Sequence, residues 1–211
     1  NFMNHPVETQ NGVLFSQLYF AENTDYGKIH GFNSISNYND FTRNVPIVTY
    51  EDFEPYIEKA RQGNPDIFWP GYIRKFAKSS GTTNAKSKFI PISDESLEDC
   101  HFKAGKDLLS IYANNHPENS LFSNKNLRLG GSSELYEDFN TKFGDLSAIM
   151  IENLPFWVEI TTTPSRKVSL MSEWESKLKA IISEVKNEDV GSLTGVPSWM
   201  MVLLQRTLTE T

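Results

Sequence analysis

Apolar residues recur at helical spacing in several segments of the chain. Val7, Leu14, Leu18 and Ala21 return at roughly every third or fourth position, and such a period indicates one buried face of a helix. Pro6 is compatible with the first turn of that helix. The pattern as a whole predicts helices over residues 6–23, 38–43, 52–62, 93–115, 172–186 and 198–208.

Local signals mark the ends of two of these helices. Thr49 precedes the helix predicted over 52–62, and Asp52 follows three residues later, as in an imperfect capping box. Gly63 comes directly after that helix and is a typical stop. Pro197 opens the last helix, where its missing N–H costs nothing. The boundaries of these two helices are therefore the best defined.

Short apolar runs lie between the helical segments. The run Ala148–Ile151 is short enough for a buried strand. The short runs predict strands over residues 73–78, 88–92, 126–130, 148–151 and 192–196. Strands that alternate with helices favour α/β architecture.

The composition is that of an ordinary folded protein, with 38% apolar and 22% charged residues in 211. No run approaches the ~20 apolar residues of a membrane helix. The net charge of −7 disfavours a nucleic acid as partner. Cys100 has no second cysteine to pair with, and the four histidines lack the spacing of a zinc site. We expect a cytoplasmic protein without a metal ligand among these residues.

The ends of the sequence carry a further expectation. The chain begins at Asn1 rather than at methionine and stops after an apolar helical run. This favours a piece of a longer chain over a short natural protein. A piece of a domain exposes apolar surface that the rest would cover. We therefore expect the 211-residue chain to self-associate.

The segment 78–88 (Lys-Ser-Ser-Gly-Thr-Thr-Asn-Ala-Lys-Ser-Lys) has the composition of a phosphate-binding loop. A glycine turn lets backbone N–H groups converge on an anion, and hydroxyl and lysine side chains add further donors. The segment is not a Walker A loop, because Ala85 replaces the second glycine and a predicted strand follows in place of a helix. A polar hairpin turn is the alternative interpretation.

The string Ser79-Ser80-Gly81-Thr82-Thr83, followed by Ser-Lys-Phe-Ile-Pro at 87–91, resembles the first signature of the adenylate-forming enzymes. It is most similar to the bacterial branch of the Gretchen Hagen family of auxin-responsive acyl acid amido synthetases. Further segments resemble that family in its order, over essentially the whole chain: residues 6–10, 24–28, 45–52, 69–71, 130–132, 144–147, 174–178 and 195–199.

This resemblance implies a fold and an activity. The fold is part of a large α/β N-terminal domain, with a mixed or parallel sheet flanked by helices. Residues 1–211 would be a single piece of that domain, without its remainder and without the C-terminal lid. Family members use ATP and Mg²⁺ to activate a carboxylic acid as an acyl-adenylate, which an amino acid then attacks to give an amide. The isolated piece is expected to be inactive.

The resemblance also assigns site residues. The residues that would bind the ATP phosphates are Ser79, Ser80, Gly81, Thr82 and Thr83. Lys88 is the candidate catalytic lysine, facing the phosphates or bracing the loop. His101, Val196 and Trp199 are candidates for contact with the acid, with packing in the core as the alternative.

Two further signatures of the family are missing. Tyr136-Glu137-Asp138 lacks the Ser-Glu order of the magnesium-binding segment. Gly144-Asp145 lies too early for the ribose-binding segment and is interpreted as a turn. No metal ligand is therefore assigned.

Other functions remain open at this point. An acyl-thioester ligase would share the phosphate loop, and a remnant without catalysis would bind nucleotide or acid only. Gly130-Gly131-Ser132-Ser133 is also compatible with the glycine-serine core of an amidase. The Ser-x-x-Lys pairs Ser176/Lys179 and Ser183/Lys186 fit a penicillin-recognising pattern, but we expect them on an exposed helix face.

Overall fold

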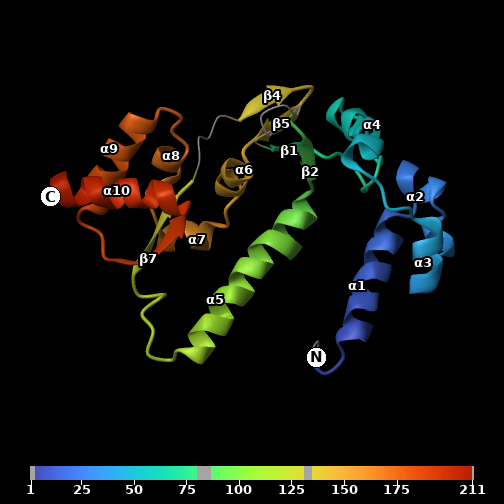
Figure 1. The fold of residues 1–211 in the computed structure, drawn as a ribbon, viewed down its shortest axis with the longest axis horizontal. Coiled ribbons are helices and arrows are strands. Elements are labelled where there is room, and N and C mark those ends of the chain that lie inside the picture. Colours follow the sequence, from blue (N-terminus) through green and yellow to red (C-terminus); the bar gives the residue numbers. More distant parts are fainter. Residues whose placement is uncertain (1–2, 80–86, 131–134, 211) are drawn as a thin grey trace.

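The computed structural model describes residues 3–79, 87–130 and 135–210 (Figure 1). Its α-helices are α1 (Pro6–Ala21), α2 (Asp25–Ile29), α3 (Tyr38–Asn44), α4 (Tyr50–Arg61), α5 (Lys103–Asn115), α6 (Leu146–Glu152), α7 (Phe156–Thr161), α8 (Arg166–Ser169), α9 (Trp174–Val185) and α10 (Pro197–Glu210). A 3₁₀ helix, η1 (Phe32–Ser34), follows α2, and a π-helix, η2 (Ser96–Phe102), precedes α5. The strands are β1 (Lys75–Lys78), β2 (Phe89–Ile92), β3 (Lys125–Leu129), β4 (Tyr136–Asp138), β5 (Thr141–Gly144), β6 (Thr162–Thr163) and β7 (Val190–Gly195).

The strands form two sheets. The first has the order β2-β1-β5-β4, in which β1 pairs parallel to β5 and antiparallel to β2. The second has the order β6-β3-β7 and is parallel throughout. Helices α1–α4 gather at one end of the molecule and α8–α10 at the other, and the long helix α5 runs diagonally between them (Figure 1). This confirms the expected α/β architecture with a mixed sheet flanked by helices.

Each sheet has its own apolar core. Phe76 of β1 is fully buried and packs with Ile57 and Ala60 of α4. In the second sheet, Leu127 and Leu129 of β3 pack under α9 and α10. A third, smaller cluster joins α6 to β1, so that α6 lies between the two sheets.

Helix α6 corrects the sequence-based prediction of a strand over 148–151. Ala148, Ile149 and Ile151 are buried, and a short run of this kind does not distinguish a buried strand from a buried helix. The deciding residue is Asp145, whose Oδ1 accepts the backbone N–H of Ser147 at 2.8 Å and caps the helix. Gly144-Asp145 is therefore not a turn: Gly144 is the last residue of β5, and Asp145 caps α6.

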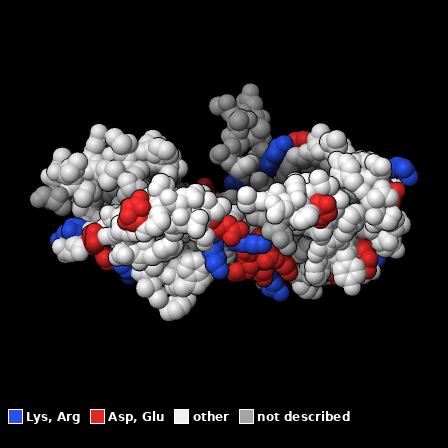
Figure 2. Space-filling view, turned by 90° about the horizontal axis from the view of Figure 1, so that it is seen from below, with Lys and Arg blue, Asp and Glu red and all other residues white. Residues whose placement is uncertain are grey.

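The long helix predicted over 93–115 also differs in detail. Residues 96–102 form the π-helix η2, and the α-helix α5 covers Lys103–Asn115. The side chains of α5 are not buried, and Leu108 and Ile111 are 67% and 58% exposed. Figure 2 shows broad areas without charge on the face seen from below, with acidic and basic side chains gathered toward its middle.

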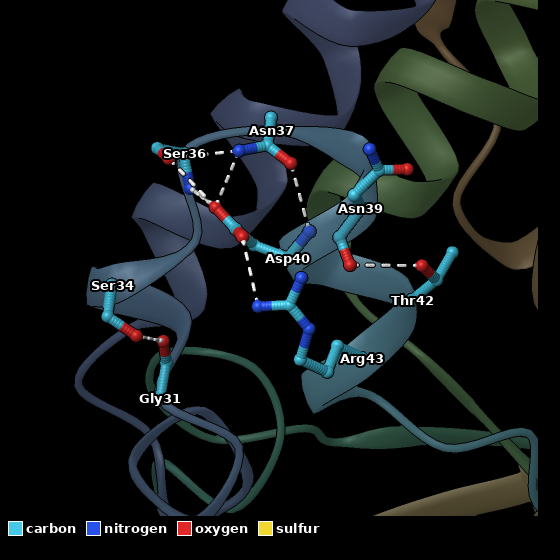
Figure 3. A network of polar contacts seen from close by, with 8 residues as sticks. All are labelled: Gly31, Ser34, Ser36, Asn37, Asn39, Asp40, Thr42 and Arg43. Atoms are coloured by element: carbon cyan, nitrogen blue, oxygen red, sulfur yellow. Dashed lines mark hydrogen bonds and ion pairs between the residues drawn. The ribbon is translucent and has the colours of Figure 1, made fainter.

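Helices α3 and α4, near the N-terminus, are both capped by side chains. Thr49 and Asp52 form a complete capping box at the start of α4, which confirms the sequence signal. At α3, Asn37 Oδ1 accepts the backbone N–H of Asp40 at 3.0 Å, and Asp40 Oδ2 in turn accepts the hydroxyl of Ser36 at 2.8 Å (Figure 3). This network is structural, since each of its bonds is made within one turn of the α3 start.

These caps predict a loss of stability in acid. The hydroxyl of Ser36 holds the pKa of Asp40 below its ordinary value, and the backbone N–H of Thr49 does the same for Asp52. A lowered folded-state pKa adds stability that is fully present above the ordinary value of about 4 and is lost as the pH falls further. The urea midpoint of the unmodified chain should fall when the pH is lowered from 6 to 3. We expect a smaller fall in the double variant Asp40→Asn/Asp52→Asn. Asp107→Asn, in the middle of α5, is the control, and an equal fall in all three proteins would contradict the prediction.

Candidate functional site

Ser79 and Lys88 face each other at the base of the hairpin between β1 and β2. The backbone N–H of Ser79 donates to the carbonyl of Lys88 at 2.9 Å. The backbone N–H of Lys88 donates to Ser79 Oγ at 3.0 Å. These bonds extend the β1–β2 ladder by one residue pair beyond Lys78 and Phe89. The two ends of the predicted phosphate loop are thereby fixed at a defined separation.

The side chain of Lys88 reaches α4. Its Nζ lies 2.9 Å from Glu51 Oε1 and 4.7 Å from the centre of the Tyr50 ring. The hydrogen bond from Lys88 keeps the pKa of Glu51 below its ordinary value. Tyr50 adds a second link, because its hydroxyl accepts the backbone N–H of Phe89 at 2.8 Å. These contacts brace the hairpin against the first turn of α4.

The predicted phosphate ligands Ser80, Gly81, Thr82 and Thr83 lie outside the described residues. Of the predicted phosphate-site residues, the structure describes Ser79 and Lys88. Beside them is a cavity of about 500 Å³, whose lining includes Ser87, Phe89 and Arg61 together with the carboxylates of Glu51, Glu54 and Glu58. Arg61 is paired with Glu58, and Lys88 with Glu51, so both of these cations already have carboxylate partners.

The three candidate acid-contact residues come from different elements. His101 is partly buried on η2, which follows β2 of the first sheet. Val196 and Trp199 follow β7 of the second sheet and are 44% and 37% exposed. Trp199 lies against Trp174 of α9, with ring centres 5.8 Å apart. The structure thus places Val196 and Trp199 together at the carboxyl end of β7, and His101 beyond the end of β2.

The carboxyl ends of β3 and β7 approach closely. A Cβ on Gly195 would stand 2.6 Å from the carbonyl oxygen of Leu129, so only glycine allows this pairing. Parallel sheets bind ligands outside the carboxyl ends of their strands. The location of the segment that begins at Gly195 is therefore compatible with a wall of a binding site.

Lys177 of α9 is a buried cation that sequence reasoning missed. Its side chain is 1% exposed, and its Nζ donates to the carbonyl of Gly130 at 3.3 Å, just beyond β3. Burial lowers the pKa of this lysine. A signal was present in the sequence: Lys177 occupies a position of the apolar stripe that continues with Leu178 and Ile181. Ser176 and Lys179, the Ser-x-x-Lys pair of the same helix, lie on its exposed face, as expected.

Metal and membrane signals are absent from the part of the chain that the structure describes. There, no three His, Cys, Asp or Glu side chains come together to hold a metal ion. Likewise, none of its helices has the length and apolar character needed to cross a bilayer. Ser132 and Ser133, considered above as amidase nucleophiles, lie outside this part.

Comparisons with known proteins relate the chain to plant enzymes. Jasmonoyl–L-amino acid synthetase JAR6 of Nicotiana attenuata is 40% identical over 76 residues, which are 36% of this chain and 13% of that protein. Indole-3-acetic acid-amido synthetase GH3.15 of Arabidopsis thaliana is 37% identical over 93 residues, or 43% of this chain and 15% of that protein.

The fold of the whole chain matches solved structures. The GH3.15 acyl acid amido synthetase superposes with a TM-score of 0.74 at 21% identity, over 94% of this chain and 35% of that one. A second structure, of the Arabidopsis protein in complex with 2,4-DB, gives a TM-score of 0.69 at 20% identity, over 96% and 36%. The chain thus spans about a third of the length of the enzymes whose fold it shares.

A family profile covers nearly every residue. The profile described as the GH3 family N-terminal domain matches residues 1–210. The resemblance found in the sequence, the α/β fold and the similarity to amido synthetases point in the same direction. The chain therefore belongs to the GH3 family, and its sequence and fold are those of the family's N-terminal domain.

Proposed function

We propose that this chain supplies the phosphate-loop part of an acyl acid amido synthetase. Such an enzyme activates a carboxylic acid with ATP as an acyl-adenylate and passes the acyl group to the amine of an amino acid. Family membership over residues 1–210 supports the proposal, as do the relatives named for forming amides of jasmonic and indole-3-acetic acid. The alternatives are another adenylate-former, such as an acyl-thioester ligase, and a binding remnant.

The described end of the hairpin fits a phosphate-binding role. Ser79 and Lys88 fix both ends of a loop of small and hydroxyl-bearing residues, and such a loop can present converging N–H donors to an anion. We propose that Ser79 to Thr83 bind the phosphates of ATP. The bound nucleotide, with Mg²⁺, supplies the adenylyl group that makes a carboxylate a good acyl donor. The magnesium ligands are not among the residues we assign.

Lys88 acts in this proposal as a positioning residue. Its ammonium group pairs with Glu51 and lies over Tyr50, so it holds the hairpin against α4. The geometry therefore favours the bracing role for Lys88 over direct contact with a phosphate. Catalysis by the loop depends on its placement, because a misplacement of about 1 Å can cost about 100-fold in rate.

We further propose that residues 1–211 are one piece of a larger N-terminal domain and that the isolated chain does not catalyse the reaction. The chain covers 35% of the amido synthetase whose fold it shares. The exposed apolar side chains of α5 and α7, among them Ile111 at 58% and Phe156 at 76%, support this view. The ordered resemblance supports a place in the bacterial branch, and the single cysteine supports a cytoplasmic location.

The test is release of pyrophosphate by the complete protein that contains this chain. It would be assayed with MgATP, a panel of aromatic and aliphatic acids, and hydroxylamine to trap the activated acyl group. We expect acid-dependent pyrophosphate and hydroxamate, with Ser80→Ala lowering kcat/KM for ATP by roughly 100-fold. Lys88→Ala is expected to lower it by about tenfold, and Lys88→Arg is expected to restore most of that loss because it keeps the ion pair.

Lys106→Ala, on the exposed face of α5, is the matched control and should leave the rate unchanged. Thioester formation with a pantetheine thiol, but no amide with any amino acid, would favour the ligase alternative. Binding of ATP without turnover of any acid would favour the remnant. If the protein bound no ATP, the assignment of the loop at 79–83 would be wrong.

A further inference from the structure

A small cavity at the carboxyl end of β6 is lined by Arg128, an arginine whose Nε is buried without a hydrogen-bond partner among the residues that the structure describes. The cavity has a volume of about 240 Å³, and its lining is formed by Arg128, Glu159, Thr162, Pro164, Ser165 and Arg166. Drug-sized ligands occupy pockets of about 300–1,000 Å³. The volume therefore suits a smaller molecule, of a few heavy atoms.

Arg128 lies on β3, the central strand of the second sheet. Its neighbours Leu127 and Leu129 face the apolar core under α9 and α10. Because side chains alternate along a strand, Arg128 projects from the opposite face. In the pairing of β3 with β6, Leu127 lies opposite Thr163, so Arg128 extends to the point where β6 ends and Pro164 begins.

The guanidinium group of Arg128 has only weak partners. Its two terminal nitrogens lie 3.4 Å from Thr162 Oγ1 and 3.5 Å from Ser169 Oγ, beyond the usual 2.7–3.2 Å of an N–H···O bond. Its Nε is buried and finds no hydrogen-bond acceptor in the described part of the chain. Burial lowers the pKa of Arg128; the charge of Glu159 opposes this effect, and the charge of Arg166 adds to it. Arg128 is partly buried, and a cation that has lost water without gaining strong partners can be stabilised by an anion.

Arg166 is less available to an anion than Arg128, because its guanidinium group already has acceptors. Its Nε donates to Glu159 Oε1 at 2.5 Å, and its terminal nitrogens donate to the carbonyls of Glu152 and Leu154 at 3.0 and 3.4 Å. Arg166 and Glu159 thus cancel each other's charge. With Arg128, the cavity carries a net charge of +1. That charge matches a monoanion such as a carboxylate better than it matches a phosphate dianion.

We propose that this cavity binds the carboxylate group of a small organic molecule, with the guanidinium fork of Arg128 as its main partner. A planar guanidinium matches the two oxygens of a carboxylate, and the hydroxyls of Thr162 and Ser165 on the cavity wall can add neutral hydrogen bonds. The proposal concerns binding only. It does not depend on whether the chain takes part in acid activation.

The experiment measures binding of acetate, glycine and inorganic phosphate to the 211-residue chain at constant ionic strength. Saturation-transfer NMR and the thermal midpoint are the two readouts. We expect acetate to bind saturably and to raise the midpoint, and Arg128→Gln to raise the apparent Kd at least tenfold. Arg43→Gln removes a cation whose side chain is 74% exposed, and it should leave the Kd unchanged.

Two additions keep the result interpretable. Arg128→Met replaces the cation with an apolar chain of similar length, which keeps the fold more readily than a polar residue would. Circular dichroism shows whether both Arg128 variants keep the fold. Glycine that binds more tightly than acetate would identify an amino acid as the ligand, with Glu159 receiving the ammonium group; the reverse order would identify a simple acid. Binding of phosphate alone, or equal binding of acetate by the Arg128 and Arg43 variants, would overturn the proposal.

Discussion

Replacing Phe76 with alanine is expected to lower the free energy of unfolding by about 3–5 kcal/mol. Phe76 is fully buried in β1, at the centre of the cluster formed with Ile57 and Ala60 of α4 and with Ile73. In the sheet it lies opposite Pro91 on one side and Phe143 on the other. Neighbours on three sides prevent the cavity from collapsing, so the cost should reach the upper part of that range.

Urea unfolding followed by circular dichroism measures this loss. Phe122→Ala is the matched control, because Phe122 is 63% exposed and should change stability by no more than about 0.5 kcal/mol. The prediction also bears on the hairpin, since Phe76 lies two residues before Lys78, where β1 ends. Equal midpoints for the two variants would show that the first sheet does not depend on this core.

Replacing Leu178 with alanine is expected to lower the free energy of unfolding by about 2–5 kcal/mol. Leu178 is fully buried in α9 and belongs to the cluster that holds α9 and α10 against β3. Loss of its side chain leaves a cavity in the core between α9 and β3. We therefore expect the second sheet to unfold at lower urea concentration.

Leu108→Ala provides the control for this second core. Leu108 is 67% exposed on α5, and its removal should be nearly neutral. Tryptophan fluorescence reports on the region directly, because Trp174 and Trp199 pack on each other beside the cluster. If the Leu178 variant kept the midpoint of the control, the packing of α9 would not be the source of stability here.

Elements with a strong local signal could be predicted from the sequence. The helix at 50–61 has a capping box and a glycine stop, and it forms within two residues of the expected bounds. The apolar run at 148–151 had no such signal within itself, and its helix depends on the cap at Asp145. The change from π-helix to α-helix near residue 103 has no marker that periodicity could detect.

For the candidate site, the sequence located a segment, whereas the contacts needed the fold. The hydroxyl-rich string at 79–83 was visible from its residue types. The partnership of Lys88 with Glu51 was not visible, because 37 positions of chain separate two residues that only the packing of α4 on β2 brings together. The assignments of Ser80–Thr83 to phosphates and of His101, Val196 and Trp199 to the acid stay predictions.

The α/β fold class, the capped start of α4 and the family of the chain could be predicted from the sequence alone. These follow from local periodicity and from ordered short motifs, which a linear chain carries without being folded. The folded structure was needed to establish the pairing of β1 with β5 and of β3 with β7, the burial of Lys177 and the partial burial of Arg128. Strand partners and buried charges depend on contacts between residues distant in the chain, and their energies arise only when folding removes water from those contacts.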